Sequence, residues 1–111
     1  ARGAAWDAPL MKNRPDQFGM GPIFGTQENF EAYRPVDLLK RIANVLRRER
    51  RLILTGYGNF REDHKRTHDL LDELKIAHDY RDGPARKHGW HSGWLPEVVE
   101  LLIGNAAERQ P

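Results

Sequence analysis

His88 is the residue whose type and setting best suit acid–base chemistry. It lies in the segment 87–96, between the last expected strand and the last expected helix. A neutral imidazole accepts a proton near physiological pH and returns it, as a general base and acid must. From spacing alone a second interpretation stays equally open, in which His88 packs against Trp90 and hydrogen-bonds a backbone carbonyl.

The loop after the first expected strand carries a second group of polar side chains. This loop spans residues 55–63 and includes Asn59, Glu62 and Asp63. Sites in open α/β sheets form at the carboxyl ends of parallel strands, so these three side chains are candidates for one site. Nucleotide binding is not expected, because the loop lacks the third glycine of a dinucleotide fingerprint and the Gly-Lys-Ser/Thr of a phosphate loop.

His64 and His68 are four residues apart on an expected helix, a spacing that places two imidazoles on one face. A zinc protease carries a glutamate directly after the first histidine, whereas Lys65 and Arg66 lie between the two here. Two cations oppose a bound metal ion, so the pair is interpreted as part of an exposed helix face and no metal site is expected. The sequence identifies no partner for His91.

Ser92 is the only serine of the chain, and its setting does not suit a nucleophile. A serine of the Gly-x-Ser-x-Gly type lies on a sharp turn from a strand into a helix. Ser92 lacks the first glycine of that motif and follows the wrong strand. A loop or helix-capping role is expected instead.

The composition indicates a globular domain. The chain has 111 residues, the size of one domain, with 39% hydrophobic and 31% charged residues. No apolar run could span a bilayer and no signal peptide is visible, so a cytoplasmic location is expected, although the missing initiator Met suggests a truncated N-terminus. The absence of cysteine excludes disulfides and thiolate metal sites. A net charge of +2 makes nucleic acid an unlikely partner, and the basic cluster at 47–51 fits a helix end.

Apolar spacing predicts alternating helices and strands after an irregular start. The segment 1–33 is expected to pack on or over the site, with Phe30 and Tyr33 facing inward, and 105–111 is expected to be a tail. The portion 34–104 is expected to be α/β. The elements are a short helix capped by Thr26, helices over 36–48, 62–75 and 95–103, and strands over 51–56 and 76–81, the second ended by 82–84.

The strand–helix–strand order predicts two parallel strands with flanking helices. Two parallel strands make a poor domain, because such sheets need helices on both faces and further strands beside them. No third strand is evident in the N-terminal segment, and a mean hydropathy of −0.76 is low for a self-contained domain. The expected fold is therefore the edge of a larger α/β sheet, incomplete on its own.

Four motifs occur in order at 34–39, 52–59, 70–78 and 88–96. The first is a Pro-x-Asp at the start of a helix, and the second is an apolar strand followed by a turn that contains glycine. The third is a leucine-rich helix end followed by Ile76 and His78, and the fourth is His-Gly-Trp followed by Leu-Pro. Together they resemble the C-terminal part of the esterase D-like family of α/β-hydrolases, which includes feruloyl esterases and mycolyltransferases.

The resemblance implies a role for several residues. His88 matches the catalytic histidine, and Asn59 stands where many members carry the acid that orients it. An amide there cannot hold the imidazole as a carboxylate does, and such a change can cost about 10⁴ in rate, so Glu62 or Asp63 would have to substitute. Tyr57 and Trp90 are the expected substrate-binding residues.

The resemblance also implies that the nucleophilic serine lies upstream of this chain. The expected function is the C-terminal portion of a serine esterase, acyl hydrolase or acyltransferase that acts on a small ester and needs no cofactor. Its expected partner is the remainder of the same hydrolase domain. The alternative is an inactive relative with a binding or assembly role, which the amide at position 59 favours.

Overall fold

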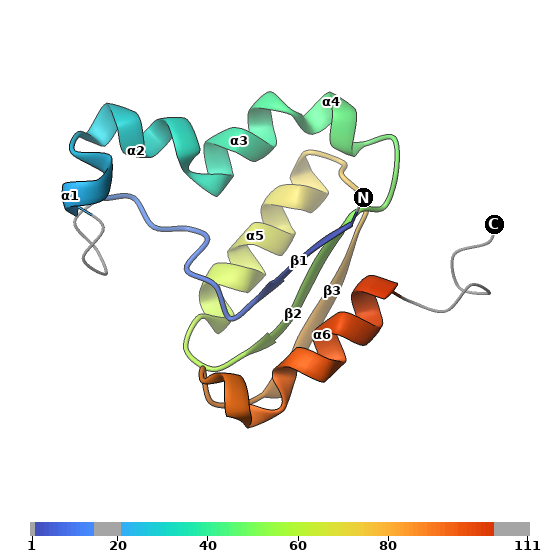
Figure 1. Cartoon of the computed structure of the whole chain (residues 1–111). Coiled ribbons are helices and arrows are strands. Elements are labelled where there is room, and N and C mark those ends of the chain that lie inside the picture. The colour runs from blue at the N-terminus through green and yellow to red at the C-terminus, as the bar shows by residue number, and fades with distance from the viewer. Residues whose placement is uncertain (1, 15–20, 104–111) are drawn as a thin grey trace.

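A parallel three-stranded sheet forms the centre of the computed structural model, which describes residues 2–14 and 21–103 (Figure 1). The strands are β1 (Gly3–Trp6), β2 (Leu52–Tyr57) and β3 (His78–Ala85), and their order across the sheet is β1-β2-β3. Because both pairings are parallel, the carboxyl ends of all three strands lie at one edge of the sheet.

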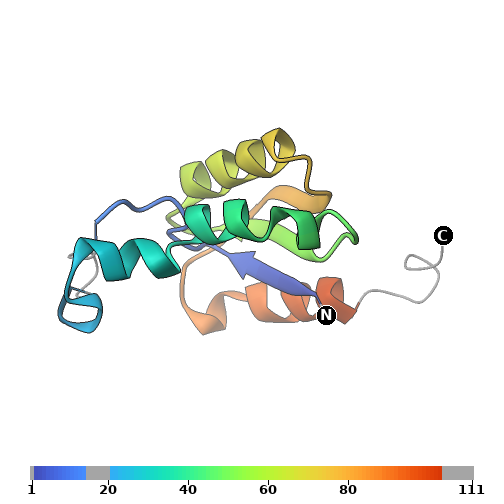
Figure 2. The same cartoon turned by 90° about the horizontal axis from the view of Figure 1, so that it is seen from above.

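Helices cover both faces of this sheet (Figure 2). The helices before β2 are α1 (Gly21–Phe24), α2 (Gln27–Tyr33), α3 (Pro35–Arg41) and α4 (Ala43–Leu46). Helix α5 (Arg61–Glu73) joins β2 to β3, and the 3₁₀ helix η2 (Trp90–Ser92) and helix α6 (Trp94–Ile103) follow β3. Helices α4 and α5 lie on one face and α6 lies on the other, so the fold is an open α/β sheet between two helical layers.

The central strand β2 is apolar along its length because both of its faces are covered. Leu52 and Leu54 pack toward α4 and α5, in a cluster whose other buried members are Ala43, Leu46, Leu71 and Ile76. Side chains alternate along a strand, so the fully buried Ile53 faces the layer of α6.

The third strand corrects the sequence prediction, which placed no strand in the N-terminal segment and counted two strands in all. Residues Gly3–Trp6 pair with β2 from Gly3 opposite Leu52 to Trp6 opposite Thr55. Glycine and alanine have low strand propensity, and Trp6 alone among the four residues favours a strand, so the pattern was too weak to predict one. Hydrogen bonding to the edge of β2 supplies the stabilisation that local propensity lacks.

The expected strand over 51–56 and the helices over 62–75 and 95–103 are confirmed to within a few residues. The expected helix over 36–48 is divided at Ile42, whose φ of −108° and ψ of 14° separate α3 from α4. The strand expected to stop at 82–84 continues to Ala85. Pro84 is tolerated there because β3 is an edge strand, where a missing N–H breaks no ladder.

The cap at Thr26 is confirmed, since its hydroxyl accepts the backbone N–H of Asn29. The inward position expected for Tyr33 is wrong, because this residue is 68% exposed. Residues 15–20 of the segment expected to pack on or over the site, and the expected tail 105–111, lie outside the described residues.

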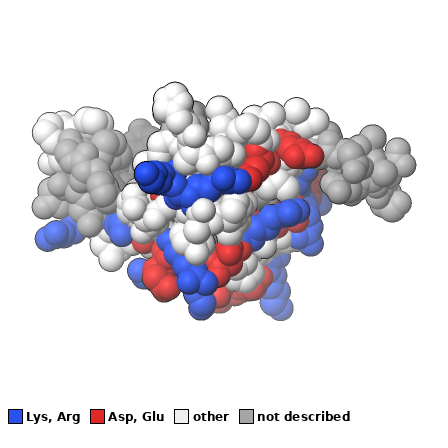
Figure 3. All heavy atoms as spheres, turned by 90° about the horizontal axis from the view of Figure 1, so that it is seen from below, with Lys and Arg blue, Asp and Glu red and all other residues white. Residues whose placement is uncertain are grey.

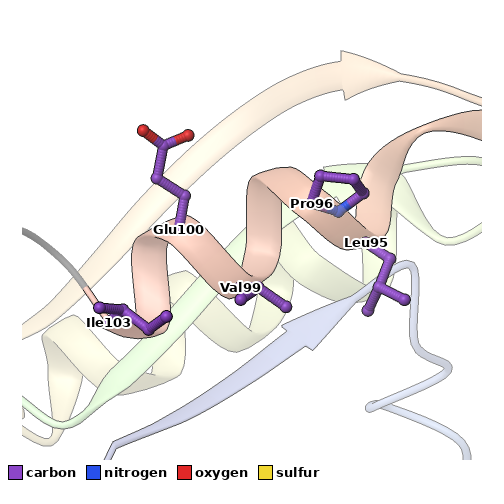
Figure 4. Close-up of a pocket in the computed structure, with 5 residues that line it drawn as sticks. All are labelled: Leu95, Pro96, Val99, Glu100 and Ile103. Atoms are coloured by element: carbon purple, nitrogen blue, oxygen red, sulfur yellow. The ribbon is translucent and has the colours of Figure 1, made fainter.

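Helix α6 carries an exposed apolar side (Figure 4). Leu95, Val99 and Ile103 follow one another along the helix and remain exposed. With Pro96 and Glu100 they line a shallow hollow on the surface. Leu38, Ile42 and Val45 on α3 and α4 are exposed as well, so apolar surface stays open in both helical layers.

Replacing Gly56 by alanine should destabilise the fold by about 2–4 kcal/mol. Gly56 has a φ of +65°, and a Cβ there would lie 2.0 Å from Nε1 of the buried Trp6. Gly3→Ala is the matched control, because no atom lies within 4 Å of its added Cβ, and it should change stability by no more than about 0.5 kcal/mol. Urea unfolding measures the stability of both variants. Equal losses of stability in the two would contradict the close approach of Trp6 to β2.

Candidate active site

Asp7 and His88 form a carboxylate–imidazole pair where the strands end. Asp7 directly follows β1 and His88 lies in the loop after β3, and the Nδ1 of His88 lies 2.5 Å from the Oδ2 of Asp7. An ionised carboxylate only accepts, so Nδ1 carries the proton and donates it. The carboxylate is 0% exposed whereas the imidazole is 56% exposed, so the second ring nitrogen, Nε2, is left available on the open side.

The second oxygen of Asp7 is held by the turn after β2. Its Oδ1 accepts the backbone N–H groups of Asn59 at 2.6 Å and Phe60 at 2.7 Å. Burial by itself raises the pKa of Asp7, but the hydrogen bonds from His88 and from the backbone N–H groups of the turn outweigh burial and lower this pKa below its ordinary value. The carboxylate therefore stays ionised although it is buried.

Gly58 allows the three strand-end loops to meet. A Cβ at this position would lie 2.6 Å from the carbonyl oxygen of Arg86, 2.8 Å from Oδ2 of Asp7 and 2.9 Å from the backbone nitrogen of His88. Two of these atoms belong to the backbone and one to the buried carboxylate, so none can move aside easily. Glycine is required here by the close packing of the site.

The first turns of α5 fix the segment that follows Asp7. Nε2 of His64 accepts the backbone N–H of Ala8 at 2.9 Å, and Asp63 accepts the backbone N–H of Met11 at 2.9 Å and the ammonium of Lys12 at 3.2 Å. His64 is only 2% exposed, so its assignment to an exposed helix face is wrong. It faces inward because the loop after β1 passes over this end of α5.

Aromatic rings surround the imidazole of His88. The Trp6 ring lies 6.1 Å away, and Phe60 presents its edge at 6.0 Å. Trp6 in turn stacks on Trp94 of α6 with ring centroids 4.8 Å apart. Aromatic rings therefore lie beside the histidine, and the ammonium of Lys12 lies 5.4 Å from the centroid of Phe60.

The residues predicted as catalytic occupy different positions around this pair. His88 lies at the strand ends, and Asn59 contributes its backbone N–H to Asp7 while its side chain is exposed. Asp63 binds Met11 and Lys12, and Glu62 is exposed on the first turn of α5. In the portions that the structure describes, no hydrogen bond joins the side chains at 59, 62 or 63 to His88.

Of the two residues predicted to bind substrate, only Tyr57 has a side chain that the structure describes. Tyr57 ends β2, and the guanidinium of Arg61 lies 5.3 Å from its ring centroid. The side chain of Trp90 lies outside the described set. Ser92 has a buried hydroxyl with no hydrogen-bond partner among the described residues.

Asp7 is the site residue that the sequence reasoning missed. Its signal was an aspartate at the end of a strand, but that strand was not predicted. The sequence therefore predicted site residues only in the loops after β2 and β3.

Charges of both signs are interspersed on the face shown in Figure 3. Several cations are paired, including Arg61 with Asp82 and Arg86 with Glu97. Three arginines of the basic cluster at 47–51 also have partners, namely the carbonyls of Leu74 and His78 and the carboxylate of Glu49. This pairing is typical of a solvated, structurally engaged helix end.

Comparisons with known proteins provide no relative. No family model, no curated protein and no solved structure matches the chain. Within residues 2–14 and 21–103, no helix is both long and apolar enough to cross a membrane.

The stability of the fold should fall as the pH drops below about 6.5, partly because of His64. Burial lowers the pKa of His64, although the carboxylates of Asp7 and Asp63 act in the opposite direction. The unfolded chain therefore binds a proton in this range that the folded chain does not, and the folded state loses at most about 1.4 kcal/mol per pH unit.

His64→Gln tests this contribution, because the glutamine side-chain oxygen can still accept the Ala8 N–H but does not titrate. Urea unfolding should be measured between about pH 7.5 and pH 5, the range in which an imidazole titrates. The free energy of unfolding should fall less steeply with pH in the variant than in the wild type. An unchanged slope would show that His64 titrates alike in the folded and unfolded chains.

Proposed function

We propose that this chain is the acid–base portion of a serine ester hydrolase or acyltransferase with an α/β-hydrolase fold. The observation that carries the proposal is the hydrogen bond between the buried Asp7 carboxylate and Nδ1 of His88. In nucleophilic acyl transfer, a carboxylate accepts the Nδ1 proton of the catalytic histidine in this way and orients its ring. The resemblance of four motifs to the esterase D-like family supports the same function.

His88 acts first as a base and then as an acid. With its Nδ1 proton held by Asp7, Nε2 has the lone pair that removes a proton from an attacking hydroxyl. The same nitrogen then returns the proton to the leaving group. The carboxylate stabilises the imidazolium formed between the two steps, and the amides of Asn59 and Phe60 prevent it from turning away.

Asp7 is the orienting acid in this mechanism. The amide at position 59 then needs no substitute, because the carboxylate comes from the loop after β1 and not from the loop after β2. Asn59 acts through its backbone N–H, which any residue except proline supplies. This removes the main reason for the alternative of an inactive binding protein, which depended on an amide in the acid's place.

The nucleophile is proposed to come from another part of the same domain. Ser92 is a poor candidate, since its hydroxyl is buried and its position after Trp90 and His91 lacks a strand-to-helix elbow. Strand β1 is an edge of the described sheet, and exposed apolar side chains lie on α6 (Figure 4) and also on α3 and α4. An open edge between two uncovered apolar layers supports a sheet that continues with further strands.

The substrate is proposed to be a small ester, held beside the aromatic wall of Trp6 and Phe60. The reaction needs no metal or organic cofactor, because the serine, the imidazole and backbone N–H groups perform every step. A nucleic-acid role has less support, since cations on the visible face are interspersed with carboxylates (Figure 3).

Asp7→Asn should lower the rate at which a fluorophosphonate labels the complete protein by about 10³–10⁴-fold. The asparagine Oδ1 can still accept both backbone N–H groups, but its amide group would face Nδ1 and favour the wrong tautomer of His88. His88→Ala should abolish labelling. Mass spectrometry of the labelled protein should locate the probe on a serine outside residues 1–111.

His91→Ala is the matched control, because this exposed histidine is three residues from His88 and should be labelled at the wild-type rate. Thermal unfolding should confirm that all three variants fold. The proposal fails when folded Asp7→Asn and His88→Ala proteins are labelled as fast as the control, or when no serine of the wild type reacts.

A further inference from the structure

Three potential metal ligands meet at the opposite end of the sheet from His88. His68 and Asp72 lie one turn apart on α5, and His78 is the first residue of β3. One ligand atom from each residue lies within 4.8 Å of the ligand atoms of the other two. We infer that these side chains bind a divalent transition-metal ion of the zinc class, independently of the function proposed for His88.

His78 is already oriented as a ligand. Its ring is buried, and its Nδ1 lies 2.8 Å from the carbonyl oxygen of Ile76, to which it donates its proton. The lone pair is therefore on Nε2, which points at His68. Metal-binding histidines commonly have this arrangement, in which a backbone carbonyl fixes the tautomer from the far side of the ring.

His68 presents the second nitrogen. Its ring stacks on Tyr80 with centroids 4.1 Å apart and an angle of 10°, which limits rotation. Its Nδ1 lies 2.7 Å from Nε2 of His78. Without a metal, Nδ1 carries the proton of that hydrogen bond, and a metal ion would replace this proton. The ring stays neutral when the proton moves to Nε2, the nitrogen on the side of Asp72.

Asp72 supplies the third ligand, a carboxylate oxygen. Its Oδ2 is 3.4 Å from Nε2 of His68, and the side chain is 63% exposed. An exposed carboxylate can change rotamer at little cost, so it can close on an ion between the rings. Because no sulfur is present, two imidazoles and one carboxylate favour zinc, nickel or copper over calcium or magnesium.

The required movement is small. Zinc binds imidazole nitrogen at about 2.0–2.1 Å, so two nitrogens in a tetrahedral site lie about 3.3 Å apart. The two rings, now 2.7 Å apart at their nitrogens, need to separate by only about 0.6 Å. His68 is partly exposed and can make this shift while it remains stacked on Tyr80.

The local charges combine the negative end of a helix with cations that already have partners. Asp72 lies in the last turn of α5, where the helix dipole is negative. Arg47 and Arg50 donate to the carbonyls of Leu74 and His78 nearby, and Arg50 also pairs with Asp79, as Lys65 does with Asp69. An ion at this position would tie the end of α5 to the start of β3.

Zinc titration of the full-length protein by isothermal calorimetry tests the site. The wild type should bind one zinc ion with a Kd below about 100 μM. Zinc should also raise its unfolding temperature. Asp72→Asn should weaken binding at least about tenfold, as expected for the loss of one charged ligand. His68→Ala should abolish binding and the thermal shift.

Asp69→Asn is the matched control, because it removes an exposed carboxylate from the same helix and leaves the three ligands in place. His88→Ala should bind zinc as the wild type does, which separates this site from the pair with Asp7. The inference is overturned if the wild type shows no stoichiometric zinc binding, or if Asp72→Asn or His68→Ala binds zinc as tightly as the wild type. It is also overturned if either control loses as much zinc affinity as Asp72→Asn does.

Discussion

The buried carboxylate of Asp7 constrains the rest of this structure. A charge removed from water costs several kcal/mol unless other groups compensate for it. Here the compensation comes from two backbone N–H groups after β2 and one imidazole after β3. The three strand-end loops therefore have to meet around one residue. This explains why Gly58, at the point of contact, has no room for a side chain.

Helix α5 connects the two ends of the molecule at which polar groups gather. Its first turn fixes the segment after Asp7 through Asp63 and His64, and its last turns carry His68 and Asp72. His64 and His68 are one turn apart, yet they face different partners, the loop after β1 and the first residue of β3. Equal spacing on a helix therefore does not place two histidines in one site when different segments cross the helix.

Apolar side chains remain exposed on both sides of the core. The buried cluster lies mainly between α4, α5 and β2, while exposed leucine, valine and isoleucine side chains continue along α6 and α3. Among the described residues, β1 pairs with β2 alone, so its outer edge is open.

The amino-acid sequence by itself determined β2, α5 and α6, because their apolar residues follow the period of a buried strand or an amphipathic helix. It also placed His88 in the loop between the last strand and the last helix. Only the tertiary structure decided β1, since three of its four residues are glycine or alanine, which have low strand propensity, and the segment is held by pairing with β2. The partner of His88 was hidden for the same reason: Asp7 is 81 residues away, and no local pattern reports a contact that arises when a sheet forms.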